Sequence, residues 1–267
     1  MARQPVVKTA LAKAALHQLR SRIAAIERAG GGSSARNEIV PLGIPAVDEA
    51  LPGGGLARAA LHEVAAPGGI FADGAAIGFA TVLAARLMES SLPILWCLND
   101  GMRHKRGDPP SSLYGPGLAA FGLDMDRVVI ARTRRDLDTL WAMEEGLRTP
   151  ALAAVIGEVM DLDLKASRRL QLAAESHGIT ALLLRPDADR LTPGAAVTRW
   201  RLDAAPKPAG PEELDEGVAE HPVWQVDLIR CRGGRPRSWR LVWRGPVKGL
   251  RLAEEVEPSQ QPRALTG

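Results

Sequence analysis

A glycine-rich segment at residues 61–87 has the layout of a phosphate-binding loop but lacks the residues that do its chemistry. An apolar run is followed by a turn containing Gly68 and Gly69 and then by an amphipathic run. A working loop ends in Gly-Lys-Ser/Thr, because the lysine reaches the β- and γ-phosphates and the hydroxyl ligates Mg²⁺. The corresponding triplet here is Gly74-Ala75-Ala76. We therefore expect a degenerate loop, no ATPase activity and no cofactor, with at most weak nucleotide binding by loop amides.

Two acidic residues lie where the rest of a nucleotide-hydrolysing site would be. Glu158 follows the apolar run 152–157, at the place of an acid that holds Mg²⁺ through water. Asp100 comes shortly after the apolar run 93–98, at the place where ATPases with this layout keep an acidic residue that polarises the attacking water. We interpret both as vestigial; strand-end solvation and helix capping are the alternative roles. The histidines and cysteines show no ligand spacing, so no metal site is expected.

A second candidate site is a basic strand late in the chain. Residues 222–251 hold eight basic residues and one acidic residue. Alternation along the strand places on one face Trp239, Leu241 and Trp243, and on the other Arg240, Val242 and Arg244. Such a ribbon could follow a phosphate backbone with salt-dependent affinity. Alternatively, its arginines solubilise a core strand or face an acidic partner. The candidate DNA contacts are Arg230, Arg232, Arg235, Arg237 and Arg240.

The elements that would position these residues alternate between strand and helix. Strand-like runs occupy residues 61–65, 93–98, 127–133, 152–157 and 179–184, and helical runs occupy 136–148 and 164–176. This alternation predicts an α/β fold with a mostly parallel sheet flanked by helices, in which each of these strands is apolar enough to be central. Three hairpin-like strands follow at 197–202, 223–231 and 238–243, so we also expect a C-terminal antiparallel hairpin.

We expect one main domain, residues 37–251, between two appendages. Residues 1–36 have the pattern of a helix and a Gly/Ser linker, and residues 252–267 that of a disordered tail. The N-terminal helix would carry an apolar seam of Leu16, Leu19, Ile23 and Ile26. That seam must dock either on the domain's own surface or on a neighbouring protomer or partner.

Charge is unevenly distributed along the chain. Residues 1–36 have seven basic residues and one acidic residue, so both ends are basic around an acidic middle. Terminal elements could meet a polyanion or an acidic protein, or these charges could simply face solvent. The two cysteines form no redox motif, and neither a signal peptide nor a membrane-spanning run is present. The sequence predicts a soluble, cytoplasmic protein.

Several ordered stretches resemble known proteins. PLGIPAVDEALPGGGL at residues 41–56 resembles the entry to a RecA-like core. Four further stretches resemble the ImuA family: LYGPGLAAFGLD at 113–124, LWAMEEGLR at 140–148, RRLQLAAESHGITALLLRP at 168–186 and WQVDLIRCRGGRPRSWRLVW at 224–243. The resemblance covers about residues 38–244.

The resemblance implies a function as well as a RecA-like fold. It implies a protein of the DNA-damage (SOS) response that acts in translesion synthesis and mutagenesis as a non-catalytic accessory factor. The implied partners are ImuB and an alternative C-family DNA polymerase, with RecA and weakly bound DNA as further candidates. Two other functions stay open: a diverged RecA-type DNA-dependent ATPase, and a cell-division inhibitor similar to SulA.

Overall fold

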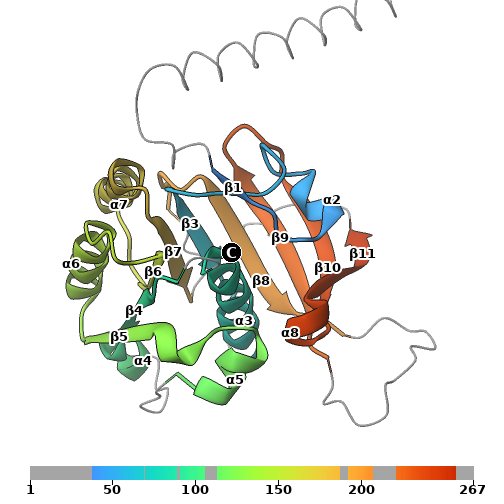
Figure 1. Cartoon of the computed structure of the whole chain (residues 1–267), viewed down its shortest axis with the longest axis horizontal. Helices are drawn as coiled ribbons and strands as arrows, with labels where there is room; N and C mark the ends of the chain where they lie inside the picture. Colours follow the sequence, from blue (N-terminus) through green and yellow to red (C-terminus); the bar gives the residue numbers. More distant parts are fainter. Residues whose placement is uncertain are drawn as a thin grey trace, which may run out of the picture.

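A nine-stranded sheet forms the centre of the molecule. The computed structural model describes residues 38–68, 70–88, 91–105, 113–186, 192–206 and 221–256. The strands, in chain order, are β3 (Leu61–Ala65), β4 (Ile94–Asn99), β5 (Val128–Thr133), β6 (Ala154–Glu158), β7 (Thr180–Arg185), β8 (Thr198–Ala204), β9 (Val223–Cys231), β10 (Arg237–Trp243) and β11 (Leu250–Val256). Their order across the sheet is β11-β10-β9-β8-β3-β7-β6-β4-β5 (Figure 1).

The sheet has a parallel part and an antiparallel part that meet at β8. Strand β8 pairs parallel with β3 and antiparallel with β9. From β8 to β5 all neighbours are parallel, and from β8 to β11 all are antiparallel. The predicted mixed α/β class, with its largely parallel sheet and C-terminal hairpin, is confirmed.

Helices cover the two faces and bury two separate cores (Figure 1). The described helices are α2 (Pro45–Asp48), α3 (Ile70–Leu87), α4 (Asp100–Lys105), α5 (Gly115–Ala120), the 3-10 helix η2 (Met125–Arg127), α6 (Asp136–Leu147), α7 (Leu164–His177) and α8 (Gly245–Lys248). Helix α3 packs on one face, in the core that includes Leu182 and Leu184. Helices α6 and α7 pack on the other, with Ala181 and Leu183. Alternate residues of β7 thus serve both cores, as expected for a central strand.

Strand β5 departs from the sequence prediction. Its run has an apolar centre between Arg127 and Arg132, but the strand lies at the edge of the sheet and all of its side chains are exposed or half-exposed. The expectation of a central strand was wrong here, because apolar content alone does not determine which neighbours a strand finds.

The antiparallel part places its tryptophans in the core that α3 covers. Trp239, Leu241 and Trp243 are buried there, as alternation predicted, together with Trp200 and Trp224. We expected a disordered tail from residue 252, but residues 252–256 continue β11, which pairs with β10. The pairing partner supplies the order that local composition did not indicate. Residues 257–267 lie outside the described part of the chain.

A compact entry segment precedes the sheet. Strands β1 (Ile39–Val40) and β2 (Leu56–Ala57) pair antiparallel, and α2 lies between them. The Asp48 carboxylate accepts the backbone N–H groups of Leu42, Gly43 and Ile44 at 2.7, 3.0 and 3.2 Å. These bonds fold the PLGIPAVD motif on itself. The predicted helix of residues 1–36, with its seam of Leu16, Leu19, Ile23 and Ile26, lies outside the described residues.

Candidate functional site

The carboxyl ends of the parallel strands meet at one edge of the sheet, which is where ligands bind in open α/β sheets. The turn after β3, Asp100 after β4 and Glu158 at the end of β6 all lie at this edge. These three segments therefore lie at the ends of nearby parallel strands. The hydrogen bonds, ion pairs and burial of these residues determine which chemistry the region can perform.

Part of the glycine-rich motif lies inside a helix and not in a loop. Strand β3 ends at Ala65 and α3 begins at Ile70, so only four residues connect them. Gly68 has a φ of +96° and lies close to Pro186, while Gly69 is outside the described residues. Gly74, Ala75 and Ala76 lie inside α3, where the N–H of Gly74 falls beyond the four groups that a helix start leaves unpaired. Gly74 therefore has no free amide to offer to a nucleotide, because the helix starts earlier than the motif suggests.

Glu158 is buried against Trp96. The indole Nε1 of Trp96 donates to Oε1 of Glu158 at 3.4 Å, and Glu158 is 2% exposed. Register places these residues close together, because Trp96 is opposite Ile156 in the pairing of β4 with β6. Among the described residues, no group of three or more His, Cys, Asp or Glu could hold a metal ion.

Burial also changes the pKa of a neighbouring thiol, that of Cys97. Burial, and secondarily the charge of Glu158, raises the pKa of Cys97 to about 12. The thiol is therefore neutral and a poor nucleophile at physiological pH.

Asp100 forms an ion pair at the same edge. As the first residue of α4, it receives the Arg132 guanidinium through two hydrogen bonds, Nε to Oδ2 at 3.0 Å and Nη2 to Oδ1 at 2.9 Å. This contact joins the ends of β4 and β5 and engages both carboxylate oxygens.

Asn99 and Asp136, which the sequence analysis did not single out, form hydrogen bonds at the same edge of the sheet. The Asp136 carboxylate accepts from Asn99 Nδ2 at 2.6 Å and from the backbone N–H groups of Met160 and Asp161 at 3.3 and 2.9 Å. Asn99 Oδ1 in turn accepts the N–H of Met102 at 3.0 Å. The available signal was the position of Asn99 at the end of a strand and of Asp136 at the start of a helix. Together they tie the ends of β4 and β6 to α6.

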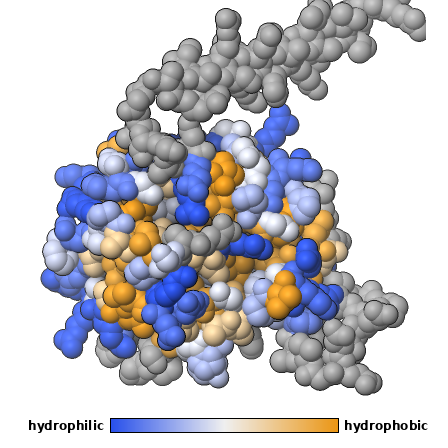
Figure 2. Space-filling view, in the orientation of Figure 1, coloured by the Kyte–Doolittle hydropathy of each residue, from blue (hydrophilic) through white to orange (hydrophobic). Residues whose placement is uncertain are grey.

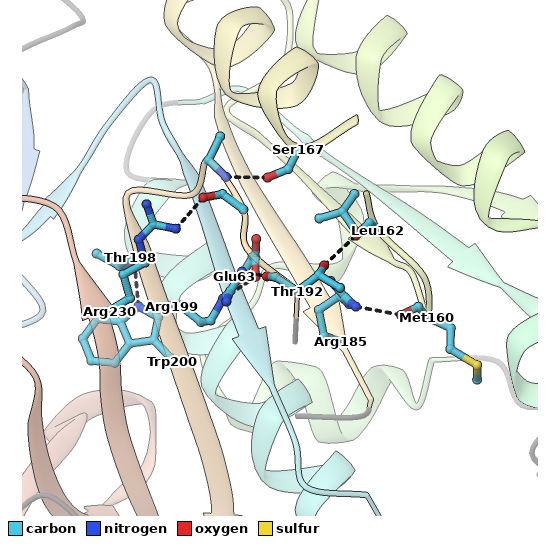
Figure 3. A network of polar contacts seen from close by, with 12 residues as sticks. Glu63, Met160, Leu162, Ser167, Arg185, Thr192, Thr198, Arg199, Trp200 and Arg230 are labelled. Atoms are coloured by element: carbon cyan, nitrogen blue, oxygen red, sulfur yellow. Dashed lines mark hydrogen bonds and ion pairs between the residues drawn. The ribbon is translucent and has the colours of Figure 1, made fainter. Parts of the chain in front are cut away.

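A buried charge network lies under the connection from β7 to β8 (Figure 3). Arg199 Nε donates to Glu63 Oε2 at 2.6 Å, and Arg185 Nη2 donates to the Met160 carbonyl at 2.9 Å. Glu63 and Arg185 are almost completely buried. Burial lowers the pKa of Arg185, an effect that the nearby Glu63 carboxylate opposes. The network therefore holds two guanidinium groups around one carboxylate.

The connection itself is fastened by two of the predicted DNA-binding arginines. Arg230 Nη1 donates to the Gly194 carbonyl (Figure 3). Arg232 Nη2 donates to the Ala195 carbonyl at 3.0 Å. Arg232 also forms an ion pair with Glu175 of α7 at 3.7 Å. On the other side, Ser167 Oγ accepts the N–H of Ala195 at 2.8 Å. Arg230 and Arg232 thus have a structural role that alternation did not reveal.

The remaining candidate arginines separate by exposure. Arg235 and Arg237 are exposed, at the β9–β10 turn and at the start of β10. Arg240 is half-buried, opposite Glu254 of β11 and Gln225 of β9. Arg230 and Arg232 are exposed as well, so four of the five predicted arginines reach the surface, and two of these four also hold the β7–β8 connection.

The fold and these strand ends define a class: a mixed α/β protein with a largely parallel sheet, whose parallel strands end in internal polar contacts. Within the described residues, no helix has the length and apolarity needed to cross a membrane.

Comparison with known proteins identifies the family. The chain is 35% identical over 221 residues to Protein ImuA from two strains of Caulobacter vibrioides, NA1000 and CB 15, covering 79% of this chain and 85% of the relatives. The chain belongs to the ImuA family. No family model matches it. It also has some similarity to the crystal structure of SulA from Pseudomonas aeruginosa, at 20% identity and a TM-score of 0.37, covering 47% of this chain and 96% of that one.

Proposed function

We propose that this chain is a non-catalytic accessory factor of error-prone translesion DNA synthesis. Its membership of the ImuA family supports a role in damage-inducible mutagenesis. The same resemblance implies assembly with ImuB and an alternative C-family DNA polymerase. The RecA-like description of the core rests on the sequence motifs at residues 41–56.

The single observation that carries the non-catalytic part is the contact between Trp96 and Glu158. A carboxylate that positions Mg²⁺ needs oxygens that the ion's water shell can reach. One oxygen of Glu158 instead accepts from an indole, and the side chain is buried. The two alanines that stand in place of the lysine and hydroxyl are buried inside α3. Both observations support a scaffold without hydrolytic chemistry.

Two apolar side chains on α6 support an assembly role. Leu137 and Trp141 are separated by one helical turn and are 72% and 66% exposed. Aromatic residues of this kind are enriched at protein interfaces. An exposed tryptophan beside a leucine gives α6 the type of anchor that a partner protein buries.

We propose that the hairpin contacts DNA only weakly. All four of Arg230, Arg232, Arg235 and Arg237 are exposed, but Arg230 and Arg232 also donate to carbonyls of the β7–β8 connection, which restricts their side chains. Two or three phosphate contacts would give weak, salt-sensitive binding. We therefore assign DNA a secondary part relative to protein contacts.

The deciding experiment measures ATP hydrolysis by the purified full-length protein with and without single-stranded DNA. We expect no turnover above that of a protein-free control. In a deletion strain, the wild-type chain and the Glu158→Gln variant should restore damage-induced mutation to the same level. DNA-dependent turnover that Glu158→Gln abolishes would overturn the proposal in favour of the diverged ATPase.

Assembly is tested separately by co-purification with ImuB and the alternative polymerase from damaged cells. We expect both to be retained by the wild-type chain and released by the paired change Leu137→Asp and Trp141→Asp. A deletion strain that keeps induced mutagenesis but loses filamentation would instead favour the division-inhibitor alternative.

A further inference from the structure

The outer face of helix α7 carries apolar and basic residues at regular spacing. Leu164, Arg168 and Leu172 follow one another at intervals of four residues, so they lie on one side of the helix. Leu164 is 38% exposed and Leu172 is 60% exposed. Lys165, three residues before Arg168, lies beside them, and both basic residues are exposed. We call these four residues the outer row of α7. Figure 2 shows mostly hydrophilic residues, with apolar ones among them, where Figure 1 places α7.

The opposite face of α7 packs on the sheet. Ala166, Leu170 and Ala174 are buried in the core that α6 and α7 cover. Gln171 is buried beside them, and its Oε1 accepts the backbone N–H of Leu61 at 2.9 Å. These contacts set the rotation of the helix about its axis. The outer row therefore faces away from the domain, toward solvent or another molecule.

The two basic residues of the outer row have no acidic neighbour on their own helix. The residues three and four positions away from Arg168 are Leu164, Lys165, Gln171 and Leu172. Within the described part of the chain, neither Lys165 nor Arg168 forms a side-chain ion pair or hydrogen bond. The adjacent Arg169 differs from them, because it pairs with Glu144 of α6 at 2.9 Å.

The exposed arginines of α6 show the contrast. Arg135, at the start of that helix, pairs with Asp138 at 2.7 Å, and Arg148, at its end, pairs with Glu145. Each of these pairs joins residues three positions apart, which is the usual way in which charges on an exposed helix face are balanced. The surface of α6 is therefore locally neutral, whereas the outer row of α7 keeps two positive charges.

A molecule that covers the outer row has to supply apolar contacts and negative charge together. Leu164 and Leu172 are eight residues apart, which is about 12 Å along the helix axis, and Arg168 lies midway between them. A second α-helix laid along α7 has the same repeat. An acidic residue on that helix, with apolar residues four positions to either side, meets the arginine and both leucines at once.

Charge complementarity argues against the other occupants. Residues 1–36 contain seven basic residues and one acidic residue, so the N-terminal segment would bring positive charge to Lys165 and Arg168. A second copy of α7 would do the same, and facing like charges are unfavourable at an interface. DNA would neutralise the two basic residues but leave Leu164 and Leu172 without apolar contacts. Single-stranded DNA is held by stacking on aromatic side chains, which the outer row does not contain.

We propose that the outer row of α7 binds an acidic amphipathic helix of another protein. A carboxylate of that helix pairs with Arg168, and its apolar residues cover Leu164 and Leu172. Burial of the leucines supplies affinity, and the two positive charges select the partner and fix its register. The interaction does not require the accessory function proposed above and uses none of the α6 residues assigned to it.

The first test puts a photoreactive benzophenone side chain in place of Leu172 in the full-length protein, in cells grown with and without DNA damage. Mass spectrometry of the joined peptides identifies what lies against α7. We expect a segment of another protein that is acidic and has apolar residues at four-residue spacing. The same side chain in place of Val247 is the matched control, because Val247 is apolar, 96% exposed and on α8.

The other outcomes of this test each count against the proposal. A cross-link to DNA, to a second copy of this chain, to its N-terminal segment or to a basic segment would show a different occupant. The absence of any product specific to position 172 would show that the outer row is a solvent-exposed surface.

Charge reversal tests whether Arg168 selects the partner. Adding Arg168→Glu should lower the yield of the cross-link at position 172 by about tenfold, because two acidic groups would then face each other. Arg134→Glu is the control with the same change in charge, since Arg134 is exposed and lies outside α7. The unfolding temperature of each variant is measured beside the yield. An equal loss in both variants would mean that only the total charge of the protein matters.

A defined peptide tests the predicted spacing directly. The probe is a labelled helical peptide in which a glutamate is flanked by leucines four positions to either side, and its matched version has lysine in place of that glutamate. By fluorescence anisotropy, we expect the full-length protein to bind the glutamate peptide about tenfold more tightly than the lysine peptide. Arg168→Glu should reverse this preference. Equal affinity for the two peptides, no binding of either, or a preference that Arg168→Glu leaves unchanged would contradict the proposal.

Discussion

Arg199 Nε lies 2.6 Å from Glu63 Oε2, and this buried pair joins β8 to β3 where the sheet changes from antiparallel to parallel. The two residues are direct partners in the strand register. Their side chains are almost fully enclosed, and Arg185 adds a second guanidinium nearby. Glu63 is thus the direct partner of the buried Arg199, and its charge also acts on Arg185, together with those of Asp161 and Asp136.

Removal of the Glu63 carboxylate should strongly destabilise the protein. We expect Glu63→Ala to lower the free energy of unfolding by about 3–5 kcal/mol, because Arg199 is left as an uncompensated buried charge. The paired change Glu63→Leu and Arg199→Met should cost less than Glu63→Ala alone. Urea unfolding monitored by circular dichroism measures all three. A double variant no more stable than the single one would show that packing, not charge, dominates here.

His62 should make the protein sensitive to acid. It is fully buried, with Nδ1 2.7 Å from Thr198 Oγ1 and Nε2 2.8 Å from the Ala57 carbonyl, and burial lowers its pKa to about 4. Between pH 6.5 and 4 the unfolded chain binds a proton at this histidine and the native chain does not, so stability falls as the pH falls. The loss due to His62 should be about 3 kcal/mol. It is measured as the difference in pH dependence of unfolding between wild type and His62→Gln; parallel curves would contradict it.

The two thiols should differ in reactivity. Cys97 has a pKa of about 12, whereas Cys231 is half-buried and its pKa is raised by burial to a smaller extent. At about pH 8 a thiol reagent should label Cys231 slowly and leave Cys97 unmodified until the protein unfolds. The Cys231→Ser variant should therefore show almost no labelling in buffer and one thiol in urea. Rapid labelling of Cys97 in buffer would mean that β4 opens frequently.

DNA binding by the hairpin should depend on Arg235 and Arg237. Replacement of both with Ala should weaken binding to single-stranded DNA and lower the slope of log affinity against log salt by about one for each phosphate that an arginine no longer neutralises. Lys165→Ala with Arg168→Ala, two exposed basic residues of α7, is the control with the same change in charge. If both double variants bind DNA equally weakly, binding reflects total charge and not the hairpin.

Local pattern was sufficient for most elements of this fold. Strand β9 was predicted with its observed ends, and the tryptophan face of β10 followed from alternation. Strand β11 was missed because its order comes from pairing with β10, a separate segment of the chain. The edge position of β5 was missed because a strand's neighbours are set by the whole topology.

In the candidate site too, local sequence predicts the position of a residue in its strand but not its contacts with other strands. The sequence placed Glu158 at the end of a strand, which is correct, but its contact with Trp96 depends on the register between β4 and β6. The Glu63–Arg199 pair joins residues 136 positions apart. No local pattern predicts that two such residues become neighbours, because only the order of strands in the assembled sheet brings them together.

The distribution of tryptophans gives this protein a built-in optical reporter. Of six indoles, Trp96, Trp200, Trp224, Trp239 and Trp243 are enclosed in the core that α3 covers, and only Trp141 is open to water. A dissolved quencher such as iodide should therefore extinguish the emission of one fluorophore and spare five. When a partner protein binds to α6, iodide should no longer reach Trp141. Binding to this helix can therefore be followed by the loss of quenching, without a label on the protein.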